Sequence, residues 1–116
     1  MGTACERAEA LARVENWPAA DVTRLVLAVG EAVGNAIEHG DPSAAEVEVE
    51  FREGDGGLDI CVSDGGPGPD PTVLERPSLP DDPLAVDGRG LFILSTVTDA
   101  MYIDGGALCL TIRPRP

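Results

Sequence analysis

The stretch LVLAVGEAVGNAIEHG, residues 25–40, decides the fold of this 116-residue chain. Its apolar side chains recur at intervals of three and four residues, which predicts an amphipathic helix with one buried stripe. The residues of this stripe are Leu25, Val29, Ala32, Val33, Ala36 and Ile37. Asp21 precedes the stripe and is the expected N-cap of the helix, and Gly40 is the expected residue just past its end.

Two polar residues of this helix, Glu31 and Asn35, are candidates for chemistry. They are four positions apart, so the spacing places them one turn from each other on one face. A carboxylate can accept a proton from a hydroxyl group, and a carboxamide oxygen is a ligand suited to Mg²⁺. The helix alone favours a polar edge that has no chemical role.

Residues outside this stretch predict a second helix and a sheet. Helical spacing covers residues 3–16, and the Trp17-Pro18 pair ends that helix. Apolar residues then alternate with polar ones at 46–51 and 58–62, and the EGDGG segment at 53–57 joins these stretches as an antiparallel hairpin. A short helix at 91–98 and strands at 101–104 and 108–112 follow.

These elements predict an α+β two-layer sandwich, in which helices cover one face of a mostly antiparallel sheet. The length suits a single domain that spans residues 1–116. Residues 69–87 contain five prolines, which exclude a long helix or a central strand. A loop of this length in a small domain is typically a lid, a binding loop or a disordered segment.

Charge and composition exclude several classes of function. The formal net charge of −13 disfavours direct contact with nucleic acid, because phosphate contacts need clustered Lys and Arg. No apolar run is long enough for a membrane span, and the N-terminal MGTACERAEA lacks the apolar core of a signal peptide. Cys5, Cys61 and Cys109 lack metal-ligand spacing, and we expect them to be reduced thiols in a cytoplasmic protein.

Two glycine-rich segments are further candidates for a binding site. DGGPG at residues 64–68 follows a predicted strand, where Asp64 could accept a hydrogen bond from an amino group of a ligand. GRG at residues 88–90 opens the short helix, where backbone N–H groups could bind an anion together with Arg89. A tight turn after the strand and an ordinary glycine-capped helix start remain open as alternatives.

Taken together, EAVGNAIEHG, DGGPG and GRGLFIL resemble the N-box and the two glycine boxes of the GHKL ATP-binding superfamily, which has the Bergerat fold. The resemblance covers residues 20–113 and is closest to the anti-sigma-factor serine/threonine kinases. It implies that Glu31 is the catalytic carboxylate and that Asn35 binds Mg²⁺. It also implies that Asp64 reads the adenine amino group and that residues 69–87 form the ATP lid. The ATP-binding residues that it implies are Asn35, Asp64, Gly66, Gly68, Gly88, Arg89, Gly90 and Leu91.

The resemblance also implies a function and partners. The chain would be an anti-sigma factor that phosphorylates a STAS-type antagonist with ATP and Mg²⁺ and sequesters a sigma factor. The partners would then be proteins, without direct contact to nucleic acid or membrane, and a homodimer is an assembly that it allows. His39 lies in the N-box, where we expect a packed or capping side chain rather than a catalytic one.

The alternative is an ATP-binding regulatory module that sequesters partners without significant kinase activity. Two departures from the family pattern favour it. The family often has Gly followed by Thr near its end, whereas Gly106 is followed by Ala107 here. The lid and its flank also hold few basic residues besides Arg76 and Arg89.

Overall fold

The structure is a computed structural model, and it describes residues 2–39, 47–54, 56–63 and 89–115. Its elements in chain order are α1 (Gly2–Val14), α2 (Ala19–His39), β1 (Glu48–Gly54), β2 (Gly57–Ser63), α3 (Arg89–Val97), β3 (Ala100–Asp104) and β4 (Ala107–Ile112). The predicted helix at 3–16 ends at Val14, and Asn16, with φ of 59°, turns the chain toward α2. The described helices include none that is long and apolar enough to cross a membrane.

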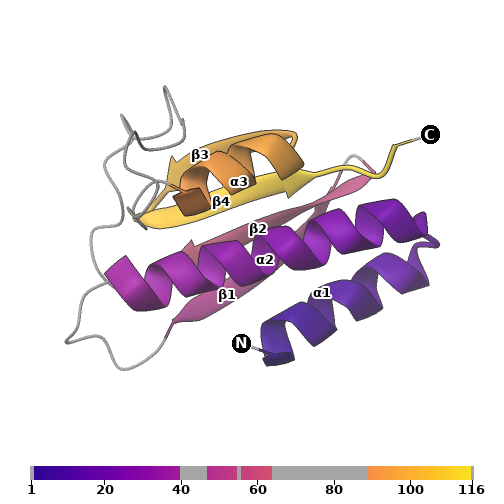
Figure 1. The fold of residues 1–116 in the computed structure, drawn as a ribbon. Helices are drawn as coiled ribbons and strands as arrows, with labels where there is room; N and C mark the ends of the chain where they lie inside the picture. Colours follow the sequence, from indigo (N-terminus) through magenta and orange to yellow (C-terminus); the bar gives the residue numbers. More distant parts are fainter. Residues whose placement is uncertain (1, 40–46, 55, 64–88, 116) are drawn as a thin grey trace.

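The strands form one sheet in the order β1-β2-β4-β3, in which each neighbouring pair is antiparallel. The helices lie on one face of this sheet (Figure 1). The α+β architecture predicted from the alternation of apolar residues is therefore confirmed, as is the β1–β2 hairpin. The order places β4, the last strand of the chain, beside β2 in the middle of the sheet, and β1 and β3 at its edges.

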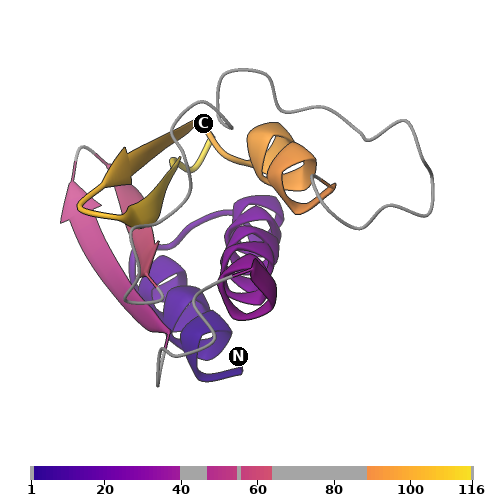
Figure 2. The same ribbon diagram turned by 90° about the vertical axis from the view of Figure 1, so that its left-hand side faces the viewer.

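The core lies between α2 and the inner face of the sheet (Figure 2). Leu25 and Val29 of α2, Ile60 of β2 and Leu110 of β4 are fully buried in it, and α3 contributes Leu94. Burying each of these large aliphatic side chains stabilises the fold by about 1.5–3 kcal/mol. The core therefore fixes the position of α2, the helix that carries Glu31 and Asn35, relative to the sheet.

The predicted stripe of α2 is buried from Leu25 to Val33, and Ala36 is partly buried. Ile37 is 62% exposed, so its assignment to the core is wrong. The flank of α2 that carries Ile37 is covered by α1, whose Cys5 Sγ lies 3.8 Å from the Val26 carbonyl oxygen. Because α1 begins at Gly2, about one turn before Cys5, it does not reach as far along α2 as Ile37.

Asp21 is not the N-cap that its position before the apolar stripe predicts. The helix begins at Ala19, and the Pro18 carbonyl accepts the backbone N–H groups of Asp21 and Val22, each at 3.0 Å. The Asp21 side chain is instead buried, and its two carboxylate oxygens accept hydrogen bonds from Arg24 and from the backbone N–H of Arg115. Its role is therefore to bind the C-terminal segment to α2.

The expectation of three reduced thiols is wrong for two of the cysteines. Cys61 of β2 and Cys109 of β4 form a disulfide, while Cys5 is free. The two residues are direct cross-strand partners, and their Cα atoms are 4.0 Å apart. Sequence spacing could not reveal this pair, because 48 positions separate the residues and only the β2–β4 pairing brings them together.

Candidate functional site

Glu31 and Asn35 lie one turn apart on α2, and both side chains are half-buried. Arg24 precedes them by seven and eleven positions, which are close to whole numbers of helical turns. The three side chains therefore lie along the same side of α2. The contacts of Arg24 therefore show which element of the fold faces the side of α2 that carries Glu31 and Asn35.

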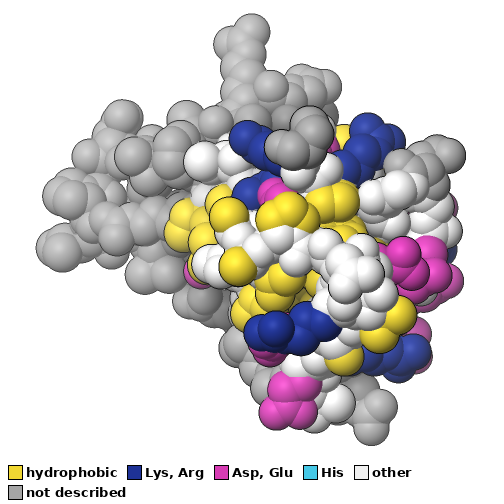
Figure 3. All heavy atoms as spheres, turned by 90° about the vertical axis from the view of Figure 1, so that its right-hand side faces the viewer, with side chains coloured by type: hydrophobic (Ala, Val, Ile, Leu, Met, Phe, Trp, Pro, Cys, Tyr) yellow, Lys and Arg dark blue, Asp and Glu magenta, His cyan; other side chains and the backbone are white. Residues whose placement is uncertain are grey.

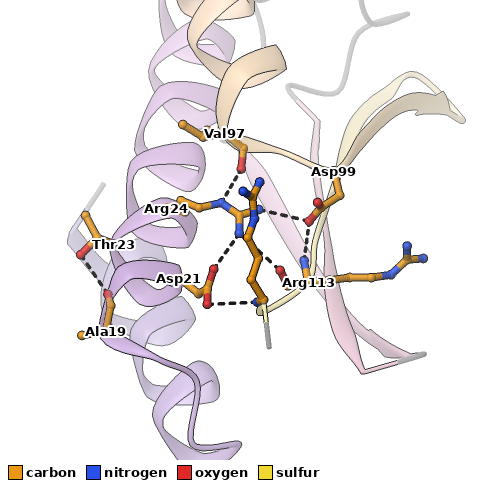
Figure 4. A network of polar contacts seen from close by, with 8 residues as sticks. Ala19, Asp21, Thr23, Arg24, Val97, Asp99 and Arg113 are labelled. Atoms are coloured by element: carbon orange, nitrogen blue, oxygen red, sulfur yellow. Dashed lines mark hydrogen bonds and ion pairs between the residues drawn. The ribbon is translucent and has the colours of Figure 1, made fainter.

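Arg24 contacts the C-terminal end of α3 (Figure 4). Its Nε donates to the Val97 carbonyl oxygen at 3.0 Å, and its Nη2 donates to Asp99 Oδ2 at 3.1 Å. Its Nη1 donates to Asp21 Oδ1 at 2.7 Å and to the Arg113 carbonyl oxygen at 3.3 Å. One guanidinium thus joins α2, the end of α3 and the end of β4, and the side of α2 that carries Glu31 and Asn35 faces α3.

The two helices run in opposite directions, so that α3 begins at the end of the molecule where α2 ends (Figure 1). β2 ends at this same end. A depression lined by Asn16, Trp17 and Pro18, immediately before α2, is also lined by Gly56 and Gly57 at the start of β2. Because α2 and β2 start at the same end of the molecule, they also finish at the same end. The C-terminal half of α2, the end of β2 and the first turn of α3 therefore lie at one end of the fold.

The described residues account for part of the predicted nucleotide site. Glu31 and Asn35 are brought together on α2, and the backbone of Arg89, Gly90 and Leu91 forms the first turn of α3. The side chains of this turn and of His39 lie outside the described part of the chain, as do Gly40, the lid at 69–87 and the remaining site residues. Those remaining residues are Asp64, Gly66, Gly68 and Gly88.

The donor set of α2 fits a hard divalent cation. The carboxamide oxygen of Asn35 is a ligand type that Mg²⁺ takes, and the Glu31 carboxylate one turn away can accept a proton from a hydroxyl group. The start of α3 adds backbone N–H groups that have no partner within the helix, together with the positive end of the helix dipole. This end of the molecule therefore combines oxygen ligands for a cation with donors for an anion.

Asp99, at the other end of α3, is held in its ionised form. Burial raises the pKa of its carboxyl group, but hydrogen bonds from the Arg113 backbone N–H, at 2.7 Å, and from Arg24 outweigh that effect. Its pKa therefore lies below the ordinary value. The charged Asp99 and Asp21 bind opposite sides of one guanidinium, which fixes the α2–α3 spacing on which the candidate site depends.

A surface depression of about 510 Å³ lies where α2 and β2 begin, at the end of the molecule opposite the C-terminal end of α2. Its lining includes Leu11 and Trp17, Leu58 at the start of β2, and Pro114 near the C-terminus. Hydrophobic side chains gather over this end, with basic and acidic ones around them (Figure 3). Neither Glu31 nor Asn35 lines this depression.

Sequence reasoning missed Arg24 as the residue that sets the geometry of this site. A signal was present, since Arg24 is the one basic residue of α2 and lies three positions after Asp21, the spacing of an ion pair on a helix. Its remaining partners lie 73 and 75 positions away, at Val97 and Asp99. Those long-range contacts depend on the packing of α3 against α2.

A comparison with known protein families supports the fold and the motif segments described above. Residues 1–113 match the model of the histidine kinase-like ATPase domain. This match covers the helices and strands of the fold as well as the three motif segments. A search of curated proteins finds no match to the chain. The chain therefore belongs to the histidine kinase-like ATPase domain family, whose members bind ATP.

Proposed function

We propose that this domain binds ATP with Mg²⁺ and transfers the terminal phosphoryl group to a Ser or Thr of a STAS-type anti-sigma-factor antagonist. In the same partner-switching module it would sequester a sigma factor. The observation that carries the proposal is the position of Glu31 and Asn35, one turn apart on the side of α2 that faces α3. Family membership supports the ATP-binding part of the proposal.

Each residue of the candidate site has a chemical role in this proposal. Glu31 would orient the acceptor hydroxyl and accept its proton, and Asn35 would hold Mg²⁺ through its carboxamide oxygen. Backbone N–H groups at the start of α3 would bind phosphate oxygens. Asp64 would accept a hydrogen bond from the adenine amino group. The cation would neutralise the phosphate charge, and the protein would position the phosphate and the acceptor hydroxyl. Phosphoryl transfer depends chiefly on this positioning and on charge neutralisation.

Nucleotide binding is tested first, by titration calorimetry of the intact chain with ATP and MgCl₂. We expect a dissociation constant on the order of micromolar for the wild type. Asn35→Ala and Asp64→Asn should each weaken binding by tenfold or more, which is about 1.4 kcal/mol. Thr23→Ala is the matched control on α2, because the Thr23 hydroxyl donates only to the Ala19 carbonyl oxygen, at 3.1 Å. The absence of ATP binding by the wild type would overturn the proposal.

Phosphoryl transfer is tested with Glu31→Gln, which keeps the size of the side chain and removes its ability to accept a proton. Radiolabelled ATP is incubated with a panel of purified STAS-type antagonists, and the label on the antagonist is counted. We expect transfer to fall by about 10²-fold or more while ATP affinity is unchanged. Glu15→Gln, in the exposed turn after α1, should leave both quantities unchanged. Full transfer by Glu31→Gln would exclude Glu31 as the catalytic carboxylate.

A second candidate function is an ATP-binding module that sequesters partners without significant transfer. The specific observation in its favour is Ala107, which begins β4 directly after Gly106, where the resembled kinases often have Thr. Ala lacks the hydroxyl group that could support an adenine-binding Asp. Tight ATP binding combined with transfer to none of the antagonists would favour this second function, and stoichiometric labelling would exclude it.

A further inference from the structure

The face of the sheet that points away from the helices carries a disulfide at its centre. Ile60 and Leu110 point into the core, so their chain neighbours Cys61 and Cys109 point to the opposite face. Although no described helix covers that face, Cys61 is only 4% exposed and Cys109 is 0% exposed. In the part of the chain that the structure describes, the cover of the disulfide is formed by side chains of the sheet itself.

The cover consists of two bridges that cross the sheet above the disulfide. Arg52 Nη1 on β1 lies 3.2 Å from Asp104 Oδ2 on β3, although these are the two edge strands. The side chains that meet must span β2 and β4, the strands that carry the cysteines. Tyr102 of β3 spans β4 in the same way, and its hydroxyl donates to Asp59 Oδ2 on β2 at 2.7 Å.

The register places this cover directly beside the sulfur atoms. Glu50 pairs with Cys61 and Tyr102 pairs with Cys109, so the disulfide lies in the same cross-strand row as two members of the cover. Glu50 also holds Arg52 in place, with Oε1 3.1 Å from Nε and Oε2 3.1 Å from Nη2. The cover is continuous from one edge strand to the other.

The Arg52–Asp104 bridge of the cover is made of exposed charges rather than of packed apolar groups. The side chains of Arg52, Glu50 and Asp104 are 44%, 62% and 56% exposed. Ion pairs with this exposure contribute little free energy and are screened by salt. The part of the cover that Arg52 and Asp104 form can thus separate at small cost.

We propose that Cys61 and Cys109 form a thiol–disulfide exchange site for a small-molecule thiol, and that the Arg52–Asp104 bridge controls access to it. A thiolate of the small molecule attacks one cysteine sulfur, the S–S bond breaks, and the other cysteine leaves as a thiolate that takes up a proton. A second thiolate resolves the mixed disulfide and releases the remaining cysteine. In total, two cysteine thiols form and two small thiols become one disulfide.

Reduction has a structural consequence as well as a chemical one. The disulfide closes a loop of 48 positions, and it cross-links the two central strands that pack beneath α2. Its loss removes a constraint on the unfolded chain. Exchange would therefore set the stability of the sheet, independently of whether the domain binds a nucleotide.

The first experiment counts the reactive thiols of the full chain and measures the temperature at which it unfolds. Protein oxidised by dissolved oxygen should show one reactive thiol after denaturation, and protein reduced with dithiothreitol should show three. The unfolding midpoint should fall on the order of 10 °C on reduction. Cys5→Ser should retain this shift, and Cys61→Ala/Cys109→Ala should abolish it. Three reactive thiols after oxidation would overturn the proposal.

The second experiment measures the rate at which dithiothreitol reduces the oxidised protein. Arg52→Ala should raise the rate on the order of tenfold, since it removes the bridge that excludes the reductant. Asp104→Asn removes the same bridge from the other edge strand and should also raise the rate. Agreement between the two variants separates loss of the bridge from misfolding of one variant. Arg13→Ala, which breaks an exposed pair within α1, is the control. Equal rates in the wild type and both bridge variants would overturn the role of the bridge.

Discussion

Arg24 Nη1 and Asp21 Oδ1 lie 2.7 Å apart, and the two side chains are only 16% and 6% exposed. The pair lies within a network that includes Asp99 and the backbone of Val97 and Arg113. Charges that have been removed from water are stable only while their partners remain. The pair therefore differs in kind from the exposed ion pairs elsewhere on the described surface.

We expect Arg24→Ala to lower the free energy of unfolding by about 3 kcal/mol, because it leaves Asp21 buried without its cation. Arg13→Ala breaks a pair whose side chains are 69% and 41% exposed, and it should cost about 0.5 kcal/mol or less. Urea unfolding at neutral pH measures both values. Equal costs for the two variants would show that the Arg24 network is not a stabilising feature.

The lowered pKa of the Asp99 carboxyl group should make the stability of the fold depend on pH in the acid range. Its folded-state pKa lies below the ordinary value of 3.8, so its contribution is present above that value and is lost as the pH falls through the folded pKa. The difference in unfolding free energy between the wild type and Asp99→Asn should therefore be constant above roughly pH 5 and should shrink below it. Urea unfolding across the acid range measures the difference. A difference that grew toward low pH would contradict the assignment.

Tyr102 is the sole tyrosine of the chain, so ultraviolet absorbance reports its ionisation directly. The hydrogen bond to Asp59, and then burial, raise the pKa of its hydroxyl above 10.0. Because this pKa is raised, the bond stabilises the fold fully below pH 10 and ceases to do so as the pH rises through the folded pKa. We expect Asp59→Asn to lower the titration midpoint toward about 10. An unchanged midpoint would argue against the bond.

Substitution by alanine at two glycines, Gly34 and Gly57, should change the stability of the fold in opposite directions. A Cβ atom at Gly34 would meet nothing within 4 Å, so Gly34→Ala should stabilise α2 by about 1 kcal/mol through helix propensity. A Cβ atom at Gly57 would lie 2.7 Å from the Ile112 carbonyl oxygen and 2.7 Å from Arg113 Cγ. Gly57→Ala should therefore cost about 1–3 kcal/mol through overpacking. Thermal unfolding of both variants checks the contrast, and a destabilised Gly34→Ala would contradict it.

The elements of the fold could be predicted because their signals are local. The apolar period of α2 and the alternation in β1 and β2 each arise within one segment, where side-chain direction follows from backbone geometry alone. The hairpin was predictable for the same reason, since the glycine-rich turn joins adjacent strands. Glu31 and Asn35 were placed together by helical spacing, without knowledge of any tertiary contact.

The features that could not be predicted depend on contacts between distant segments. Cys61 meets Cys109 only because β4 inserts between β2 and β3, an order that no local pattern specifies. Ile37 has the period of a core residue, but its exposure is decided by where α1 begins. Asp21 has the composition of an N-cap, but tertiary contacts with Arg24 and Arg115 determine its position. The predicted roles of Asp64 and the glycine boxes stay predictions.

The positions of β1 and β3 at the two edges of the sheet have a consequence for colloidal behaviour. An edge strand offers unpaired backbone groups on which another chain can add as a strand, and this is how aggregation and fibril growth begin. Both edges here carry charge on the outer face, with Glu48, Glu50 and Arg52 on one and Asp104 on the other. These four side chains are three carboxylates and one guanidinium, so their excess negative charge would disfavour the addition of a strand from a neighbouring molecule, and neutralising the carboxylates should favour lateral self-association.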